Sequence, residues 1–259
     1  MEYNFYKYQG TGNDFILIDD RSNSFPIKDN ALVARLCDRR FGIGADGLIL
    51  IQNVESSDFK MIYFNSDGNE STLCGNGARC TIAFAKFLGC IGNETTFEAI
   101  DGLHSAYIKD TIVSLQMHDV SEIHNFESHS FLDTGSPHHV EMVNNLKEFN
   151  VFSNGKRIRN GSPYNEAGTN VNFVEQLSED QFSIRTYERG VEDETLSCGT
   201  GATAVALAMH KNKKTSSNKI RINVVGGVLE IQFESSEKGY SQIFLSGPAE
   251  QVFSGTFKI

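Results

Sequence analysis

The chain has 259 residues, 39% of them hydrophobic, which is enough apolar material for one large domain or two of ordinary size. Its net charge of -10 at pH 7 argues against nucleic acid or an anionic membrane as partner and favours a small molecule. Because no signal-peptide pattern opens the sequence and no apolar run approaches about 18 residues, we expect no membrane association and a cytoplasmic location.

The cysteines exclude two common roles. They are odd in number and include no Cys-x-x-Cys pair, so they fit neither a disulfide framework nor a structural zinc site. We therefore expect free thiols at all five positions, which are Cys37, Cys74, Cys80, Cys90 and Cys198.

A hairpin and a capped helix come first in the predicted order of elements. Strand-like residues on both sides of the turn at 10–14 predict a hairpin with Asn13 at its tip. Asp29 is placed to cap a helix over residues 30–40, which Gly42 then ends.

The next segment carries a motif in the wrong context. Residues 42–47 match G-x-G-x-x-G, but a helix precedes them and the strand 48–51 follows, the reverse of dinucleotide-binding order. We therefore assign these glycines to a tight loop. Strand 59–64 then delivers Asn65 at a turn, nine positions before Cys74.

The rest of the chain predicts further strands and a second helical segment. A polar stretch at 121–130 is the expected link between two halves. The predicted strands are 95–99, 103–108, 112–117, 140–143, 171–174, 182–187, 220–224, 227–233 and 241–245, with one helix inside 145–160.

One short motif occurs twice. Residues 74–80 (CGNGARC) recur in reduced form at 198–201 (CGTG), and each copy opens a small apolar helix. Each copy therefore places a thiol, Cys74 or Cys198, at a helix N-terminus, where unpaired N–H groups and the helix dipole favour the thiolate. Two such thiols indicate a pair of catalytic bases.

The repeated cysteine motif also predicts the architecture. We expect an α+β fold of two pseudo-symmetric domains, each a mostly antiparallel β-layer or barrel wrapped around a central apolar helix, with the active site in the cleft between them. The predicted domains are 1–119 with Cys74 and 120–259 with Cys198, and the last few residues are free to pack back on the first half.

At these cysteine motifs the chain resembles diaminopimelate epimerase. The resemblance extends from end to end and in order, through the segments GTGNDF at 10–15, FNSDG at 64–68, TNVNF at 169–173 and YERG at 187–190. Asn76 is its most specific mark, because the related proline racemases carry His after the first Cys-Gly.

The resemblance implies interconversion of LL- and meso-diaminopimelate in lysine and peptidoglycan precursor synthesis, with no cofactor and no metal. Cys74 and Cys198 would exchange the roles of base and acid on opposite faces of the α-carbon. Backbone donors at Gly75, Asn76, Gly199 and Thr200 would bind the substrate carboxylate. Asn13 and Glu188 would hold the ammonium at the reacting centre, and Asn65, Asn170 and Arg189 the distal end.

Three further positions are expected to support the site. His138 would lie near the thiols. Gly47 stands where some members carry a ligand-binding Gln, and Ser136 where the better-known pattern has Asn. His138 and its neighbour His139 do not predict a metal site, since adjacent residues of a strand face opposite ways.

Other functions stay open at this point. One is a cofactor-independent racemase of another amino acid, and another is a non-catalytic amino-acid-binding or thiol-redox protein on the same scaffold. Two intact helix-start cysteines disfavour a degenerate binder, and the lack of Cys-x-x-Cys disfavours dithiol exchange. We expect a small-molecule substrate and a homodimer as the assembly.

Overall fold

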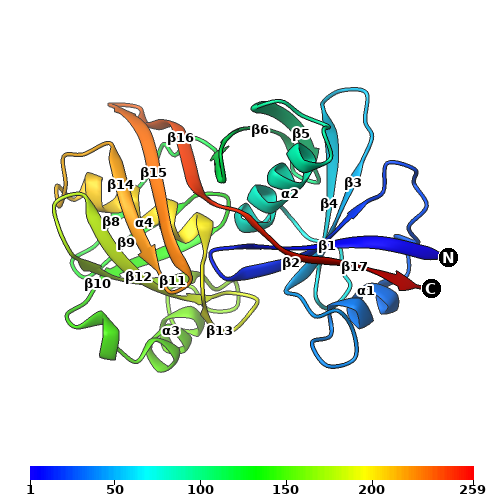
Figure 1. The fold of residues 1–259 in the computed structure, drawn as a ribbon. Helices are drawn as coiled ribbons and strands as arrows, with labels where there is room; N and C mark the ends of the chain where they lie inside the picture. The colour runs from blue at the N-terminus through cyan, green and yellow to red at the C-terminus, as the bar shows by residue number, and fades with distance from the viewer. The chain divides into compact units, whose positions relative to one another are not determined.

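A computed structural model describes all residues 1–259 and divides the chain into two compact units (Figure 1). The first unit comprises Met1–Leu115 and Gly247–Ile259, and the second comprises Gln116–Ser246. The predicted functional halves, 1–119 and 120–259, stay a prediction. No helix combines the length and apolar character needed to cross a membrane.

The first unit is an open, mostly antiparallel sheet with two helices. Its strands are paired in the order β17-β1-β2-β3-β4-β5-β6-β7, and only β2–β3 and β4–β5 are parallel. The elements are β1 (Glu2–Gly10), β2 (Asn13–Asp19), α1 (Asn30–Cys37), β3 (Gly47–Gln52), β4 (Phe59–Asn65), α2 (Gly75–Phe87), β5 (Glu94–Ala99), β6 (Gly102–Lys109), β7 (Ile112–Gln116) and β17 (Glu250–Lys258).

The second unit repeats this plan. Strands β9 to β16 pair in the order β9-β10-β11-β12-β14-β15-β16, with β10–β11 and β12–β14 parallel. The elements are β8 (His124–Asn125), β9 (Ser130–Asp133), β10 (Pro137–Met142), η1 (Leu146–Glu148), α3 (Val151–Asn160), β11 (Asn170–Gln176), β12 (Gln181–Glu188), β13 (Asp193–Thr195), α4 (Gly199–Lys211), β14 (Lys219–Val224), β15 (Gly227–Ser236) and β16 (Gly239–Pro248).

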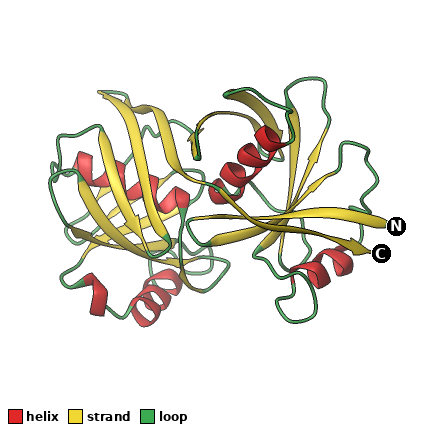
Figure 2. Ribbon diagram, viewed as in Figure 1, coloured by secondary structure: helices red, strands yellow, loops and turns green.

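The duplication predicted from the cysteine motifs is therefore visible in the topology. From β1 to β7 and from β9 to β16, the successive pairings have the same order: antiparallel, parallel, antiparallel, parallel, antiparallel and antiparallel. Helix α2 comes after β4, and helix α4 comes after the corresponding strand β12 and the short strand β13. Few helices stand among many strands (Figure 2), so the predicted α+β class is confirmed, as open layers rather than closed barrels.

Each unit covers a central helix with its sheet. Helix α2 and helix α4 each bury ten of their thirteen residues, as the apolar sequence on all sides of both helices predicted. Side chains alternate across the sheet, so Phe15 and Ile49 face α2 whereas Ile16 and Leu48 join the core with α1. Helix α3 packs in the same way against β11 and β12.

One helix end was predicted wrongly. The helix extends from Asn30 to Cys37 and not to residue 40, although Asp29 caps it by accepting a hydrogen bond from the Leu32 N–H at 2.9 Å. The Asp38 carboxylate accepts the N–H groups of Arg40 and Phe41, both at 2.7 Å, which turns the backbone out of the helix. A Cβ on Gly42 would lie 2.0 Å from the Arg35 carbonyl oxygen, so only glycine permits the chain to fold back there.

Candidate active site

The first thiol lies where the motif predicted it. Cys74 is the N-cap residue of α2, with φ -96° and ψ 119°, and Gly75 and Asn76 form the first helical positions. First-turn N–H groups have no partner inside a helix, which is why helix N-termini are common anion-binding positions. A Cβ on Gly77 would lie 3.5 Å from Cys74 Cβ and 3.1 Å from Ile49, so glycine lets the helix start pack closely on the sheet.

Asn13 at the hairpin tip contacts this thiol. Its Oδ1 accepts a hydrogen bond from Cys74 Sγ at 3.6 Å and another from Asn76 Nδ2 at 3.2 Å. Its Nδ2 donates to Asp46 Oδ2 at 2.5 Å. Three predicted site residues, Asn13, Cys74 and Asn76, are therefore brought together, and Asp46 fixes the orientation of the amide that joins them.

Asp46 belongs to a charge cluster that the sequence analysis missed. Arg39 Nη2 lies 2.7 Å from Asp46 Oδ1 and 2.6 Å from Asp14 Oδ1, and Lys7 Nζ lies 2.7 Å from Asp14 Oδ2. Lys7 also donates to the Gly44 carbonyl oxygen. Burial opposes ionisation of Asp14, but its bonds with Arg39 and Lys7 prevail and hold its pKa well below the ordinary value.

A buried arginine supports the same turn. Arg79 is 0% exposed on α2, and its Nη2 donates to Thr11 Oγ1 at 3.2 Å. Thr11 has a φ of +52°, in the left-handed region, and lies in the turn that presents Asn13. Burial lowers the pKa of Arg79. Arg79 therefore holds the hairpin turn against the helix that carries Cys74.

Asn65 and Gly47 are register partners on neighbouring strands β4 and β3. The Asn65 side chain is half-buried and makes no hydrogen bond within the chain. A Cβ on Gly47 would lie 2.5 Å from the Phe64 carbonyl oxygen and 2.6 Å from Tyr63 Cε2. Tyr63 therefore occupies the space that a side chain at position 47 would need, which gives a physical reason for the missing Gln.

The second thiol is arranged in the same way. Cys198 is the N-cap residue of α4, with φ -125° and ψ 109°, and Gly199 and Thr200 begin the helix. Cys198 Sγ lies 3.5 Å from Thr200 Oγ1. Thr134, which the sequence analysis did not single out, donates to the Thr200 carbonyl oxygen at 2.9 Å and ties β9 to the helix start.

Ser136 and His138 contact this helix start. Ser136 Oγ donates to Thr200 Oγ1 at 3.3 Å and lies 3.0 Å from His138 Nε2. His138 Nδ1 lies 3.1 Å from Asn172 Nδ2. A Cβ on Gly201 would lie 2.4 Å from Asn172 Oδ1 and 3.3 Å from Cys198 Sγ, so Asn172 approaches α4 as closely as a glycine allows.

The remaining predicted contacts lie at the end of β12. Asn170 Oδ1 accepts the Arg189 backbone N–H at 2.9 Å, and its Nδ2 donates to Ser136 Oγ at 3.2 Å. Arg189 is exposed and its Nη1 donates to the Ala167 carbonyl oxygen at 3.0 Å. Glu188 Oε2 accepts from the Thr195 hydroxyl at 2.9 Å. Asn170 therefore joins Ser136 to the strand end that carries Arg189.

Two of the other cysteines, Cys37 and Cys80, are buried, as the packing role predicted for them requires. All five cysteines are free, as expected. Burial raises the pKa of Cys37 and of Cys80 to about 12, so both stay neutral thiols. Cys90 is half-buried, and burial raises its pKa as well.

The two adjacent histidines face different surroundings, as predicted. His139 Nδ1 bonds to the Tyr164 hydroxyl at 2.9 Å, and its ring stacks on His129 with centroids 4.2 Å apart. His138 instead faces Ser136 and Asn172. Their rings therefore do not share one metal ion.

The neutrality of His138 has a measurable consequence. Burial, aided by the charge of Arg189, lowers its pKa from 6.5 to about 3. Between these two pH values the unfolded chain binds a proton that the folded chain does not, so stability falls as the pH falls. We expect this residue alone to lower the free energy of unfolding by about 1.4 kcal/mol per pH unit below pH 6.5.

Urea unfolding at pH 7 and pH 4.5 tests this expectation. The variant His138→Gln has no imidazole to protonate, so its stability should depend less steeply on pH than that of the parent. Identical slopes for the two proteins would show that the pKa of His138 is the same in the folded and the unfolded chain, which would contradict this expectation.

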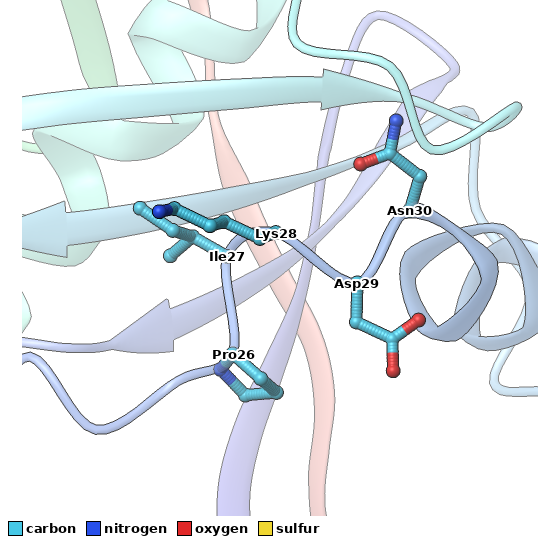
Figure 3. Close-up of a pocket in the computed structure, with 5 residues that line it drawn as sticks. All are labelled: Pro26, Ile27, Lys28, Asp29 and Asn30. Carbon is cyan, nitrogen blue, oxygen red and sulfur yellow. The ribbon is translucent and has the colours of Figure 1, made fainter.

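A surface hollow elsewhere carries none of these residues. It is lined by Pro26, Ile27, Lys28, Asp29 and Asn30, just before α1 (Figure 3). Its carboxylate, on Asp29, is already used to cap that helix. The hollow is therefore not the candidate site.

Known proteins resemble the chain along almost its whole length. The profile of the family described as diaminopimelate epimerase matches residues 5–120 and 130–252. A diaminopimelate epimerase of Flavobacterium psychrophilum is 61% identical over 97% of this chain and 98% of its own length. Another, of Aquifex aeolicus, is 40% identical over 97% of this chain and 96% of its own length.

Solved structures show the same fold at low identity. A phenazine biosynthesis protein of the PhzF family from Bacillus anthracis is 15% identical, has a TM-score of 0.81 and is covered over 100% of both chains. A probable proline racemase from Agrobacterium radiobacter, also 15% identical, has a TM-score of 0.66 over 99% of this chain and 92% of its own. The resemblance predicted from the sequence is confirmed, and the chain belongs to the diaminopimelate epimerase family.

Proposed function

We propose that the protein is an isomerase that interconverts LL- and meso-diaminopimelate by transfer of the α-proton between two thiols. The observation that carries the proposal is the matched placement of Cys74 and Cys198. Each is the N-cap of the central helix of its unit, and the two helices follow corresponding strands. A thiol at such a position is favoured as a base.

The reaction needs one thiolate and one thiol. The thiolate takes the α-hydrogen as a proton, the α-carbon becomes a planar carbanion, and the thiol returns a proton to the opposite face. The first-turn amides of α2 and α4, at Gly75, Asn76, Gly199 and Thr200, are proposed to stabilise the charge that moves onto the carboxylate. No cofactor or metal takes part in this proposed scheme.

We assign the remaining contacts by residue. Asn13 and Glu188 are proposed to bind the ammonium at the reacting carbon, and Asn65 and Arg189 the distal end of the substrate. The Asn170 amide donates to Ser136 and accepts from the Arg189 backbone N–H, so Asn170 is proposed to position Arg189.

The proposal extends to the cellular setting. We infer a role in lysine and peptidoglycan precursor synthesis, a cytoplasmic location, no nucleic-acid partner in view of the net charge of -10, and a homodimer. Strand β17 exposes Val252 and Phe253, apolar side chains of the kind that subunit contacts cover. Light scattering on the purified protein measures its oligomeric state.

Solvent exchange tests the reaction. In deuterium oxide, incubation with LL-diaminopimelate should give meso-diaminopimelate that carries deuterium at the inverted α-carbon, without added pyridoxal phosphate and in the presence of a chelator. Exchange with another amino acid but not with diaminopimelate would indicate a different racemase. No exchange with any amino acid would indicate a binding protein.

Arg189 provides a prediction about substrate length. Its proposed partner is the distal carboxylate, which alanine and proline do not have. The bidentate geometry of Arg is lost in Arg189→Lys, so we expect kcat/KM for diaminopimelate to fall by an amount equivalent to about 2–3 kcal/mol. Equal turnover of a monocarboxylic amino acid by the parent protein would contradict this role.

A further inference from the structure

The proton on His138 can be assigned to one nitrogen. Asn172 Nδ2 donates to the His139 carbonyl oxygen at 2.9 Å, and Asn172 Oδ1 accepts from the Thr186 hydroxyl at 2.9 Å, so the amide has one orientation. The same Nδ2 faces His138 Nδ1 at 3.1 Å. An amide nitrogen only donates, so Nδ1 is the acceptor, and the single proton of the neutral ring lies on Nε2.

The proton on His138 Nε2 determines the orientation of the Ser136 hydroxyl. His138 Nε2 lies 3.0 Å from Ser136 Oγ, and Asn170 Nδ2 lies 3.2 Å from it, so both nitrogens donate to the serine oxygen. The one proton of the Ser136 hydroxyl then points to Thr200 Oγ1, 3.3 Å away. Ser136 therefore accepts twice and donates once, towards the helix start.

The Thr200 hydroxyl accepts a hydrogen bond from Ser136 and is therefore oriented to donate one to Cys198. Its hydroxyl oxygen accepts from Ser136, and its own proton has Cys198 Sγ as the nearby protein acceptor, at 3.5 Å. A sulfur that accepts a hydrogen bond at a helix N-terminus is stabilised as the thiolate. Burial keeps the His138 ring neutral, and the positive charge of Arg189 adds to this effect on its pKa.

In the first unit the cysteine is a hydrogen-bond donor and not an acceptor. Asn13 turns its acceptor, Oδ1, towards Cys74 because its Nδ2 is held by Asp46. A carbonyl oxygen cannot donate, so Cys74 Sγ supplies the proton at 3.6 Å and is stabilised as the thiol.

We propose that Ser136 is a positioning residue that relays hydrogen bonds from His138 through Thr200 to Cys198, so that the resting enzyme holds a Cys198 thiolate and a Cys74 thiol. The inference rests on the proposed two-thiol function and specifies which thiol is ionised before substrate binds. The substrate isomer whose α-hydrogen faces Cys198 then meets the enzyme ready for reaction. Its C–H bond breaks, the proton passes to Cys198, and the Cys74 proton bonds to the opposite face of the carbon.

Each such turnover leaves the opposite protonation state, a Cys74 thiolate and a Cys198 thiol. The relay restores the resting state when Cys74 regains a proton from solvent and Cys198 releases one. The cycle balances, and no redox partner is involved.

Alkylation of the substrate-free enzyme tests the relay directly. Iodoacetamide reacts with thiolates, so the pH dependence of labelling at each cysteine, read by peptide mass spectrometry, reports its ionisation. We expect Cys198 to be labelled at lower pH than Cys74 in the parent protein. In Ser136→Ala the Cys198 midpoint should rise by about one pH unit, with that of Cys74 unchanged, and kcat/KM should fall about tenfold.

Three further variants sharpen the test. Ser136→Thr keeps a hydroxyl and should restore the Cys198 midpoint, and exposed Ser178→Ala is the matched control expected to change nothing. Thr200→Val breaks the relay one step later and should reproduce Ser136→Ala, which provides a second test if that variant folds poorly. An unchanged Cys198 midpoint in both relay variants, or a Cys74 midpoint below that of Cys198 in the parent, would overturn the proposal.

The labelling result and the function are separable. A relay-dependent Cys198 midpoint in a protein that exchanges no α-proton would refute the proposed function and leave the relay intact. Normal exchange with a midpoint that does not depend on the relay would refute the relay alone.

Discussion

Replacing either helix-start cysteine with alanine is expected to lower kcat for diaminopimelate by roughly 10²–10⁴-fold, the usual contribution of a positioned acid or base. Cys74→Ala leaves one face of the α-carbon without a proton donor or acceptor, and Cys198→Ala does the same for the other. The measurement is epimerisation followed by proton NMR in deuterium oxide, which reports turnover and α-exchange together.

The three packing cysteines are the controls. Cys90→Ala and Cys37→Ala should keep kcat, with Cys37→Ala costing some stability because Cys37 belongs to the core around α1. Cys80→Ala is the strictest control, since Cys80 is 0% exposed on the same helix as Cys74. Near-normal turnover by Cys74→Ala or Cys198→Ala would rule out the two-thiol mechanism.

A single methyl group at position 201 is expected to damage both stability and activity. In Gly201→Ala the new carbon would lie 2.4 Å from Asn172 Oδ1 and 3.3 Å from Cys198 Sγ, so the amide or the helix start must shift. Overpacking of this kind costs about 1–3 kcal/mol, measurable by urea unfolding. Because Asn172 sets the His138 tautomer, we also expect kcat to fall about tenfold or more.

Gly92→Ala is the matched control for that variant. No atom lies within 4 Å of the Cβ that it would add, and the position has no left-handed φ, so stability and kcat should both stay near those of the parent. If Gly201→Ala behaved like Gly92→Ala, the close approach of Asn172 to α4 would not matter for the site.

The parts of the fold that depend on neighbouring residues in sequence could be predicted. Cys74 and Cys198 are helix N-caps because glycines follow each of them and a continuous apolar pattern begins there. The Asn13 hairpin likewise follows from a local turn between two strand-like runs. The predicted end of α1 was wrong because hydrogen bonds from backbone N–H groups to the Asp38 side chain override the helical pattern.

Long-range contacts could not be predicted in the same way. Asp46 reaches Asn13 across 33 positions, and a carboxylate inside a glycine-rich loop carries no local sign of that partner. Strand β17 was not predicted at all, partly because Gly255 interrupts its pattern, although Phe5 on β1 packs directly against that glycine. Asn172 could have been found, since alternation along a strand places it on the same face as Asn170.

Strand β17 also sets the order in which the chain can fold during synthesis. It pairs with β1 from Glu2–Lys258 to Gln9–Glu250, and the Met1 amino group bonds to the Ile259 carbonyl oxygen at 2.8 Å. The second unit is one continuous segment, Gln116–Ser246, which lies between these two strands in the chain and is synthesised before β17. The hairpin that presents Asn13 obtains its neighbouring strand only after the whole second unit has been synthesised, so the first unit matures last. A circular permutant in which residues 247–259 precede residue 1 would let it mature earlier.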